Sequence, residues 1–157
     1  MLLQQLNEVL KMKTKRINAF SLKVPSKSAN EGFLRATVAA FSAQLDPTVD
    51  EISDIKTAVS EAVTNCIVHA YKDTIGLITL TCEIFENGVL RVKVRDKGCG
   101  IEDVKQAMQP LFTTGDVEER AGLGFAVMES FMDKVKVRSK VGGGTTVIME
   151  KKIASKV

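Results

Sequence analysis

The sequence predicts an α+β fold, a two-layer sandwich in which one mixed sheet carries helices on one face. A length of 157 residues and a hydrophobic content of 45% are enough for one domain with a buried core. Apolar residues alternate in segments that are joined by short turns, which is typical of β-hairpins. Segments with helical spacing lie between these strands, as expected for a sheet that is covered by helices on one face.

The first half of the chain predicts one strand followed by two helices. Residues 17–24 alternate apolar and polar side chains, which indicates a strand. Residues 26–31 include serine, asparagine and glutamate, which favour the start of a helix, and the helix that follows ends at Asp46 and Pro47. Residues 48–69 form the longest helical pattern, with no glycine or proline inside it.

The second half predicts two hairpins separated by a long loop and a helix. Asn87-Gly88 joins the first hairpin, because this dipeptide tolerates the positive φ of a type I′ turn. A loop rich in glycine, threonine and charge starts at Asp96 and ends at Gly122, which opens the last helix. The predicted strands are 78–85, 89–94, 135–139 and 145–151, and the predicted helices are 104–108 and 123–132.

Composition and charge exclude several classes of function. The 22 lysines and arginines against 19 acidic residues leave a net charge of +3, which is too small to predict a direct nucleic-acid partner. No apolar run approaches the ~18 residues that a membrane span needs, so we expect no membrane partner. Three cysteines, at spacings that fit neither a Cys-x-x-Cys nor a zinc pattern, predict a reduced, cytoplasmic chain.

A candidate site begins with Glu61 and Asn65 on the longest predicted helix. Their spacing of four places them on one face, one turn apart. The amide oxygen of Asn65 can ligate Mg²⁺, a cation that prefers oxygen ligands. The Glu61 carboxylate can accept the proton of an attacking hydroxyl. Taken alone, the same pair also fits an ordinary solvated helix face.

Two glycine-containing segments follow along the chain. Asp96, at the end of a strand, can accept a hydrogen bond from the amino group of adenine, and Gly98 and Gly100 permit close approach of the backbone. The segment Gly122-Leu123-Gly124, at a predicted helix start, offers unpaired amides to phosphate groups. Each segment alone also fits an ordinary turn or a helix opened by glycine.

A last segment, Gly144-Thr145-Thr146, opens the final predicted strand. The order of these four segments resembles the four boxes of the Bergerat ATP-binding fold of the GHKL superfamily, which includes gyrase, MutL and the histidine kinases. Within that superfamily the chain resembles the anti-sigma F factors, serine kinases of spore-forming bacteria. The resemblance covers about residues 17–152. The stretches that carry it are 35–41, 44–48, 59–65, 109–114 and 128–133.

The resemblance implies a role for each candidate residue. Asn65 would hold Mg²⁺, and Glu61 and Arg120 would be catalytic, Glu61 as the base and Arg120 at the γ-phosphate of ATP. Glu31 and Arg35 would contact the partner proteins. The remaining nucleotide-binding positions would be Asp96, Gly98, Gly100, Thr113, Thr114, Gly122, Leu123, Gly124 and Thr145. Cys99 departs from the family pattern, in which an aliphatic residue is usual between the two glycines.

The function implied by the resemblance is that of an ATP-bound homodimer that sequesters the sporulation sigma factor F and phosphorylates a serine of an anti-anti-sigma protein. The alternatives are a stress-response anti-sigma serine kinase and the ATP-binding domain of a sensor histidine kinase. A gyrase-like or MutL-like ATPase would need a further domain. We expect residues 16–157 to form the kinase domain and residues 1–15 to be an extension without function.

Overall fold

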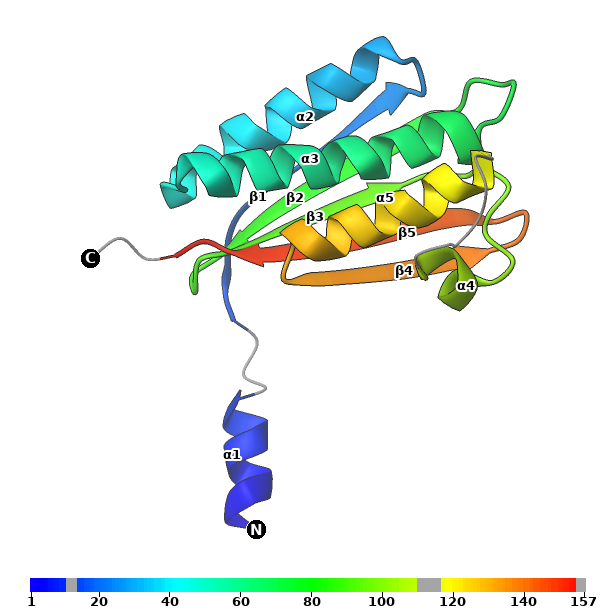
Figure 1. The fold of residues 1–157 in the computed structure, drawn as a ribbon. Coiled ribbons are helices and arrows are strands. Elements are labelled where there is room, and N and C mark those ends of the chain that lie inside the picture. Colours follow the sequence, from blue (N-terminus) through cyan, green and yellow to red (C-terminus); the bar gives the residue numbers. More distant parts are fainter. Residues whose placement is uncertain (11–13, 110–116, 155–157) are drawn as a thin grey trace.

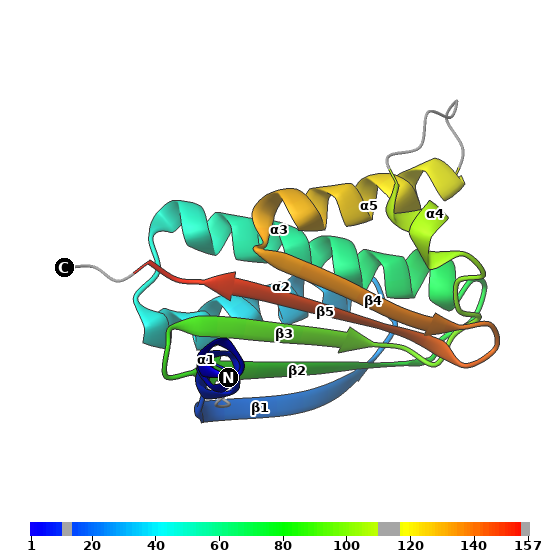
Figure 2. The ribbon, with the colours of Figure 1, turned by 90° about the horizontal axis from the view of Figure 1, so that it is seen from below.

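The structure is a computed structural model that describes residues 1–10, 14–109 and 117–154. Within two helices, the side chains of residues 7–10 and 117–123 lie outside this description. Five strands form one sheet, and the main helices pack on one face of it (Figure 1). The opposite face of the sheet is open (Figure 2). The two-layer α+β sandwich predicted from the sequence is therefore confirmed.

The strands are β1 (Arg16–Pro25), β2 (Leu77–Phe85), β3 (Val89–Arg95), β4 (Lys134–Lys140) and β5 (Gly144–Lys152). The helices are α1 (Leu2–Leu10), α2 (Ala29–Ser42), α3 (Val49–Asn65), α4 (Val104–Met108) and α5 (Val117–Phe131). A short 3₁₀ turn, Ala43–Leu45, follows α2, and a π turn, Cys66–Ala70, follows α3.

The sheet is antiparallel throughout, so the prediction of a mixed sheet is wrong. Its strand order is β1-β2-β3-β5-β4, and all four neighbouring pairs run in opposite directions. Two of these pairs are the predicted hairpins, β2 with β3 and β4 with β5. The connection through α5 and β4 brings β5 back beside β3 in the opposite direction, so no parallel pair arises.

Helix α3 crosses the centre of the helical layer and positions the candidate site. Thr48 caps its start, because the Thr48 hydroxyl accepts from the Glu51 amide while the Glu51 carboxylate accepts from the Thr48 amide. Its inner stripe is fully buried and packs toward the sheet, and includes Ile55, Val59, Ala62 and Val63. Burial of this stripe fixes which face of α3 remains for function.

Two helix boundaries differ from the sequence prediction. The α-helical part of the long helix ends at Asn65, and the chain continues through the π turn Cys66–Ala70. Helix α5 begins at Val117, so Gly122 and Gly124 lie inside it and do not open it. The helix start predicted at residue 122 is therefore wrong.

Helix α1 stands apart from the sandwich (Figure 1) and exposes Leu2, Leu3 and Leu6. The boundary between an extension over residues 1–15 and a domain over residues 16–157 stays a prediction. Among the described residues, no helix combines the length and the apolar character that crossing a membrane requires.

Candidate functional site

Asp96, which follows β3, is the most strongly bound carboxylate of the site. It is 5% exposed, and its Oδ1 accepts from the backbone amides of Gly98 (2.9 Å) and Thr145 (3.1 Å). Its Oδ2 accepts from the thiol of Cys66, with Sγ at 3.5 Å. These contacts provide the hydrogen bonds that a buried carboxylate needs.

The Cys66 thiol remains a proton donor in this environment. Burial raises the pKa of Cys66 well above its ordinary value, and the charge of Asp96 raises this pKa further. Cys66 is 3% exposed and begins the π turn directly after Asn65. The π turn therefore places the Cys66 thiol next to Oδ2 of the Asp96 carboxylate.

The loop after Asp96 is held by the same π turn and by Tyr71. The Tyr71 hydroxyl accepts from the Lys97 amide at 2.6 Å and donates to the Leu77 carbonyl at 2.6 Å. A Cβ at Gly98 would overlap the carbonyl oxygen of Ala70. At this position glycine is required by the protein's own backbone, whatever the ligand.

Gly100 is required for two reasons. Its φ is +77°, and a Cβ there would overlap the carbonyl oxygen of Lys140 in the β4–β5 turn. The segment from Asp96 to Gly100 is thus pressed between the π turn on one side and the β4–β5 turn on the other. This packing gives the loop a fixed shape.

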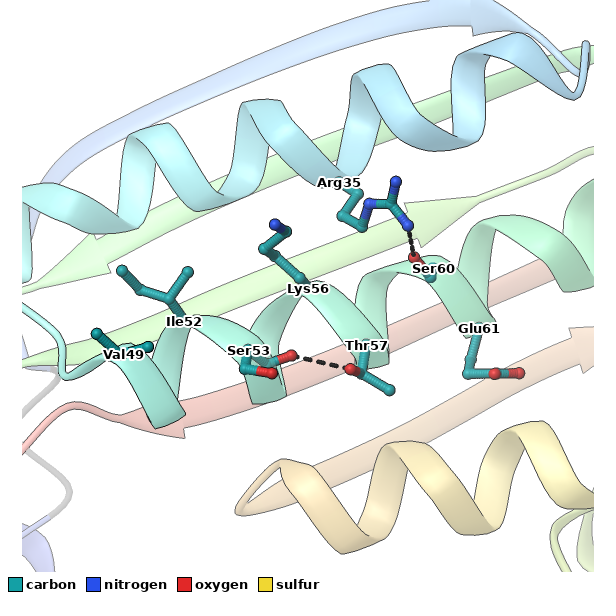
Figure 3. A pocket seen from close by; sticks show the side chains of 8 residues that line it. All are labelled: Arg35, Val49, Ile52, Ser53, Lys56, Thr57, Ser60 and Glu61. Carbon is teal, nitrogen blue, oxygen red and sulfur yellow. Dashed lines mark hydrogen bonds between the residues drawn. The ribbon is translucent and has the colours of Figure 1, made fainter.

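Glu61 and Asn65 are both half-buried and lie one turn apart on one face of α3, as predicted. A Cβ at Gly124 of α5 would lie 3.1 Å from Glu61 Oε2 and 3.4 Å from Asn65 Oδ1. Figure 3 shows the Glu61 side chain on the side of α3 that faces α5. Gly124 therefore gives the two helices room to approach at this pair.

The electrostatic environment of Glu61 suits a base. Burial raises the pKa of Glu61, and the negative charge of Glu31 on α2 raises it further. A base with a raised pKa holds an abstracted proton more firmly near neutral pH. Asn65, in contrast, has a buried Nδ2 without a hydrogen-bond partner among the described residues.

Thr145 is buried at the start of β5 and supports the same carboxylate as Cys66. Its amide donates to Asp96, and its hydroxyl lies 2.7 Å from the hydroxyl of Ser139. Ser139 in turn accepts from the Ile101 amide at 2.7 Å. The contact of Thr145 with phosphate stays a prediction, whereas its contact with Asp96 is observed.

Glu31 and Arg35 meet Ser60 between α2 and α3. Arg35 Nη1 lies 3.3 Å from Glu31 Oε1 and 3.4 Å from Ser60 Oγ, to which it donates (Figure 3). The Ser60 hydroxyl donates to Glu31. A groove of about 670 Å³ runs along α3 from Val49 to Glu61, and Arg35 also lines it (Figure 3). Arg35 and the predicted base therefore line one groove, and Glu31 is joined to it through its contacts with Arg35 and Ser60.

Comparison with known proteins identifies the family. Residues 24–151 match the family described as Histidine kinase-like ATPase domain. An anti-sigma F factor of Caldanaerobacter subterraneus subsp. tengcongensis is 60% identical over 136 residues, which are 87% of this chain and 94% of that protein. An anti-sigma F factor of Geobacillus stearothermophilus is 52% identical over 140 residues, which are 88% of this chain and 95% of that protein. The chain belongs to the anti-sigma F factor family.

Solved structures confirm the fold of this anti-sigma F family member. The RsbU and RsbW domains of Rv1364c from Mycobacterium tuberculosis superpose with a TM-score of 0.65 at 19% identity, covering 87% of this chain and 32% of that one. The histidine kinase domain of the Erythrobacter litoralis blue-light activated histidine kinase superposes with a TM-score of 0.51 at 22% identity, covering 76% and 61%. At these identities the likeness shows the fold alone.

The residues present fit ATP and Mg²⁺, the groups expected in an ATP-binding domain of this anti-sigma F family. Among the described residues, no cluster of three His, Cys, Asp or Glu could hold a metal by itself. Asn65 offers one oxygen ligand, its side-chain Oδ1. The buried atom without a partner among the described residues is its Nδ2, a hydrogen-bond donor that cannot ligate a metal. Mg²⁺ characteristically takes one or two protein ligands and completes its shell with water and phosphate oxygens.

Several predicted site residues of this anti-sigma F family member cannot be placed. Thr113 and Thr114 lie outside the described residues, as do the side chains of Arg120 and Leu123. Gly122 and Gly124 lie within α5, and of these two positions Gly124 is the one seen beside Glu61 and Asn65.

Sequence reasoning missed Cys66, Tyr71 and Ser139, which hold the Asp96 segment in place. Tyr71 binds Lys97, and Ser139 binds Ile101 and Thr145, across distant parts of the chain. No local motif marks such contacts. The one available signal was the position of Cys66 directly after Asn65, a predicted site residue.

Proposed function

We propose that this chain is an anti-sigma factor that sequesters sigma factor F in its ATP-bound state and phosphorylates a serine of an anti-anti-sigma protein. One observation carries the proposal. In a member of the anti-sigma F family, Glu61 and Asn65 lie one turn apart beside α5, and the buried Asp96 carboxylate lies beyond them at the π turn. A proton acceptor, a metal ligand and a base-reading group thus follow one another in this order.

Glu61 would take the proton of the partner's serine hydroxyl as that oxygen attacks the γ-phosphorus. Its raised pKa supports this role. Asn65 would hold Mg²⁺, which neutralises charge on the phosphates when it is bound. Arg120 would lie at the γ-phosphate, and Thr113, Thr114 and the segment Gly122-Leu123-Gly124 would close over the phosphate groups.

Asp96 would accept from the amino group of adenine. Guanine carries a carbonyl oxygen at that position, which would face the carboxylate and repel it. Gly98 and Gly100 would line the base side of the site, and their backbone is held too rigidly to yield to a larger base.

Glu31 and Arg35 would form the partner surface for both the sigma factor and the anti-anti-sigma protein. Arg35 is half-exposed and borders the groove that ends at Glu61, which supports a surface on which a bound protein can deliver its serine to the base. We further propose that the chain works as a homodimer in the cytoplasm, where sigma factors meet RNA polymerase.

Transfer of labelled phosphate tests this proposal. The protein is mixed with ATP labelled at the γ-phosphate and with each candidate anti-anti-sigma protein, and the labelled residue is identified. Label on a partner serine supports the proposed kinase. Label on histidine would indicate a sensor kinase, and release of free phosphate alone would indicate an ATPase. Transfer only to a stress-response partner would replace the sporulation assignment.

A further inference from the structure

The Cys66 thiol is aimed at the carboxylate that we assign to adenine. Its Sγ lies 3.5 Å from Asp96 Oδ2, a normal distance for a hydrogen bond from sulfur. Cys66 is 3% exposed and Asp96 is 5% exposed, so water does not screen the contact. The first residue of the π turn is thereby tied to the end of β3.

The contacts of Asp96 divide its two oxygens into different roles. Oδ1 accepts two backbone amides, from Gly98 and Thr145, and each carboxylate oxygen has about two acceptor sites. Oδ2 accepts only the thiol of Cys66 among the described residues. One acceptor site on Oδ2 is therefore still available for a ligand.

We propose that Cys66 is a positioning residue for base recognition: its thiol fixes the plane of the Asp96 carboxylate so that Oδ2 presents its remaining acceptor site to the amino group of adenine. The inference rests on the role of Asp96 in the proposed function. A thiol suits this position because it is a weak donor that packs like a small apolar group. It can orient the carboxylate without competing strongly with the ligand.

A second buried cysteine provides a matched control. Cys82 lies fully buried in the middle of β2, where it pairs in register with Phe20 and Val92. No hydrogen bond from its thiol occurs among the described residues, and Cys82 takes part in none of the hydrogen bonds of the Asp96 carboxylate. Replacing Cys82 removes a buried sulfur of the same size without touching the carboxylate.

The test compares ATP with inosine triphosphate, in which a carbonyl oxygen replaces the amino group of adenine. Equilibrium binding of both nucleotides to the full chain is measured by calorimetry for the wild type and for Cys66→Ala, Cys66→Ser, Cys82→Ala and Asp96→Ala. The wild type should prefer ATP. Cys66→Ala should lower ATP affinity about fivefold and leave inosine triphosphate affinity within about twofold, since a hydrogen bond of this kind is worth about 1 kcal/mol.

The other variants separate hydrogen bonding from packing. Cys66→Ser keeps a donor and should recover most of the preference for ATP, Cys82→Ala should keep all of it, and Asp96→Ala should lose all of it. An unchanged ratio of the two affinities in Cys66→Ala would overturn the inference, and so would a Cys66→Ser ratio equal to that of Cys66→Ala. Equal binding of both nucleotides by the wild type would refute it together with the adenine contact. A protein that prefers ATP yet phosphorylates no partner would contradict the proposed kinase and leave this inference standing.

Discussion

At the scale of single residues, two carboxylates of the site have different environments that suit different chemistry. Asp96 is buried and accepts three hydrogen bonds, so its charge is held in place. Glu61 is half-buried, and both its burial and the charge of Glu31 raise its pKa. The Glu61 environment disfavours the anion, so Glu61 is suited to accept a proton. Asp96 accepts hydrogen bonds from two backbone amides, so its carboxylate is suited to hold a ligand.

Two substitutions on one helix turn should separate binding from chemistry. Asn65→Ala should abolish Mg²⁺-dependent ATP binding, because it removes the one side-chain metal ligand that we assign. Glu61→Gln should keep ATP affinity and slow phosphate transfer about 10²- to 10⁴-fold, as expected for loss of a general base. Nucleotide titration and single-turnover transfer on the same preparations would check this. Equal losses of affinity in both variants would show that the two roles are wrongly assigned.

The raised pKa of Glu61 predicts how the rate of phosphate transfer depends on pH. The base works only when it is ionised, so the transfer rate should fall as the pH drops through the Glu61 pKa, which lies above that of an ordinary glutamate. Glu31→Gln removes the like charge and lowers the Glu61 pKa, so the acidic limb of kcat should move to lower pH. Profiles are recorded at saturating ATP and partner, with Asp54→Asn on the same helix as control. A limb that stays in place or moves upward in Glu31→Gln would contradict this.

At the scale of elements, the site depends on a π turn that presses against a glycine loop. The turn Cys66–Ala70 supplies the Ala70 carbonyl, which accepts from the Cys99 amide at 3.2 Å and lies against Gly98. Tyr71 then anchors Lys97 from the other side. π turns are uncommon and are frequently found at functional sites.

Gly98→Ala should disturb this packing strongly. The new Cβ would overlap backbone atoms of Ala70, which cannot move without opening the π turn. We expect the free energy of unfolding to fall by about 1–3 kcal/mol and ATP affinity to fall with it. Gly143→Ala is the control, because the three atoms nearest to its new Cβ belong to the side chain of Lys140, of which the Lys140 Cβ is nearest at 3.3 Å, and none is a backbone atom. Equal midpoints of denaturant unfolding for the two variants would show that the packing of Gly98 against the π turn does not contribute to stability.

Most elements were predictable from local signals, and the site only in part. Alternation along the strands, the hairpin at Asn87-Gly88 and the helix start near Thr48 are local in sequence, and the structure contains all three. The predicted type I′ turn is wrong, because Gly88 has a positive φ of +84° and Asn87 does not. The π turn was missed because the helical apolar spacing continues through it. The early start of α5 was missed because Gly122 and Gly124 indicate a helix start at residue 122. The contact between Cys66 and Asp96 joins residues 30 apart and has no sequence motif.

At the scale of the whole molecule, the two faces of the sandwich differ. The helical layer carries Glu61, Arg35 and the groove between them. The open face of the sheet (Figure 2) carries exposed cations on the edge strand β4, at Lys134, Lys136, Arg138 and Lys140. Lysines on an edge strand oppose pairing with another sheet edge. The net charge of the chain is only +3, but its positive side chains are unevenly distributed over the two faces of the sandwich.

Arg35→Ala should weaken partner binding without disturbing the fold or the nucleotide site. The Arg35 side chain is 42% exposed, and ion pairs at that exposure contribute at most about 1 kcal/mol to stability. As an interface arginine it should contribute roughly 2 kcal/mol or more to binding of the sigma factor, the anti-anti-sigma protein or both. Titrations of partner and nucleotide would measure this, with Arg138→Ala on the open face as control. Collapse of ATP affinity with normal partner binding would make Arg35 a nucleotide-site residue.

The most direct measurement is the affinity of the wild-type protein for sigma factor F with and without ATP and Mg²⁺. Glu61 belongs to the proposed ATP site and also lines the groove that Arg35 borders, so we expect nucleotide and sigma factor to bind cooperatively. We predict tight sigma binding with ATP, at least about tenfold weaker binding without it, and loss of the difference in Asn65→Ala. Sigma binding of equal strength with and without nucleotide, or no binding at all, would contradict the proposed function.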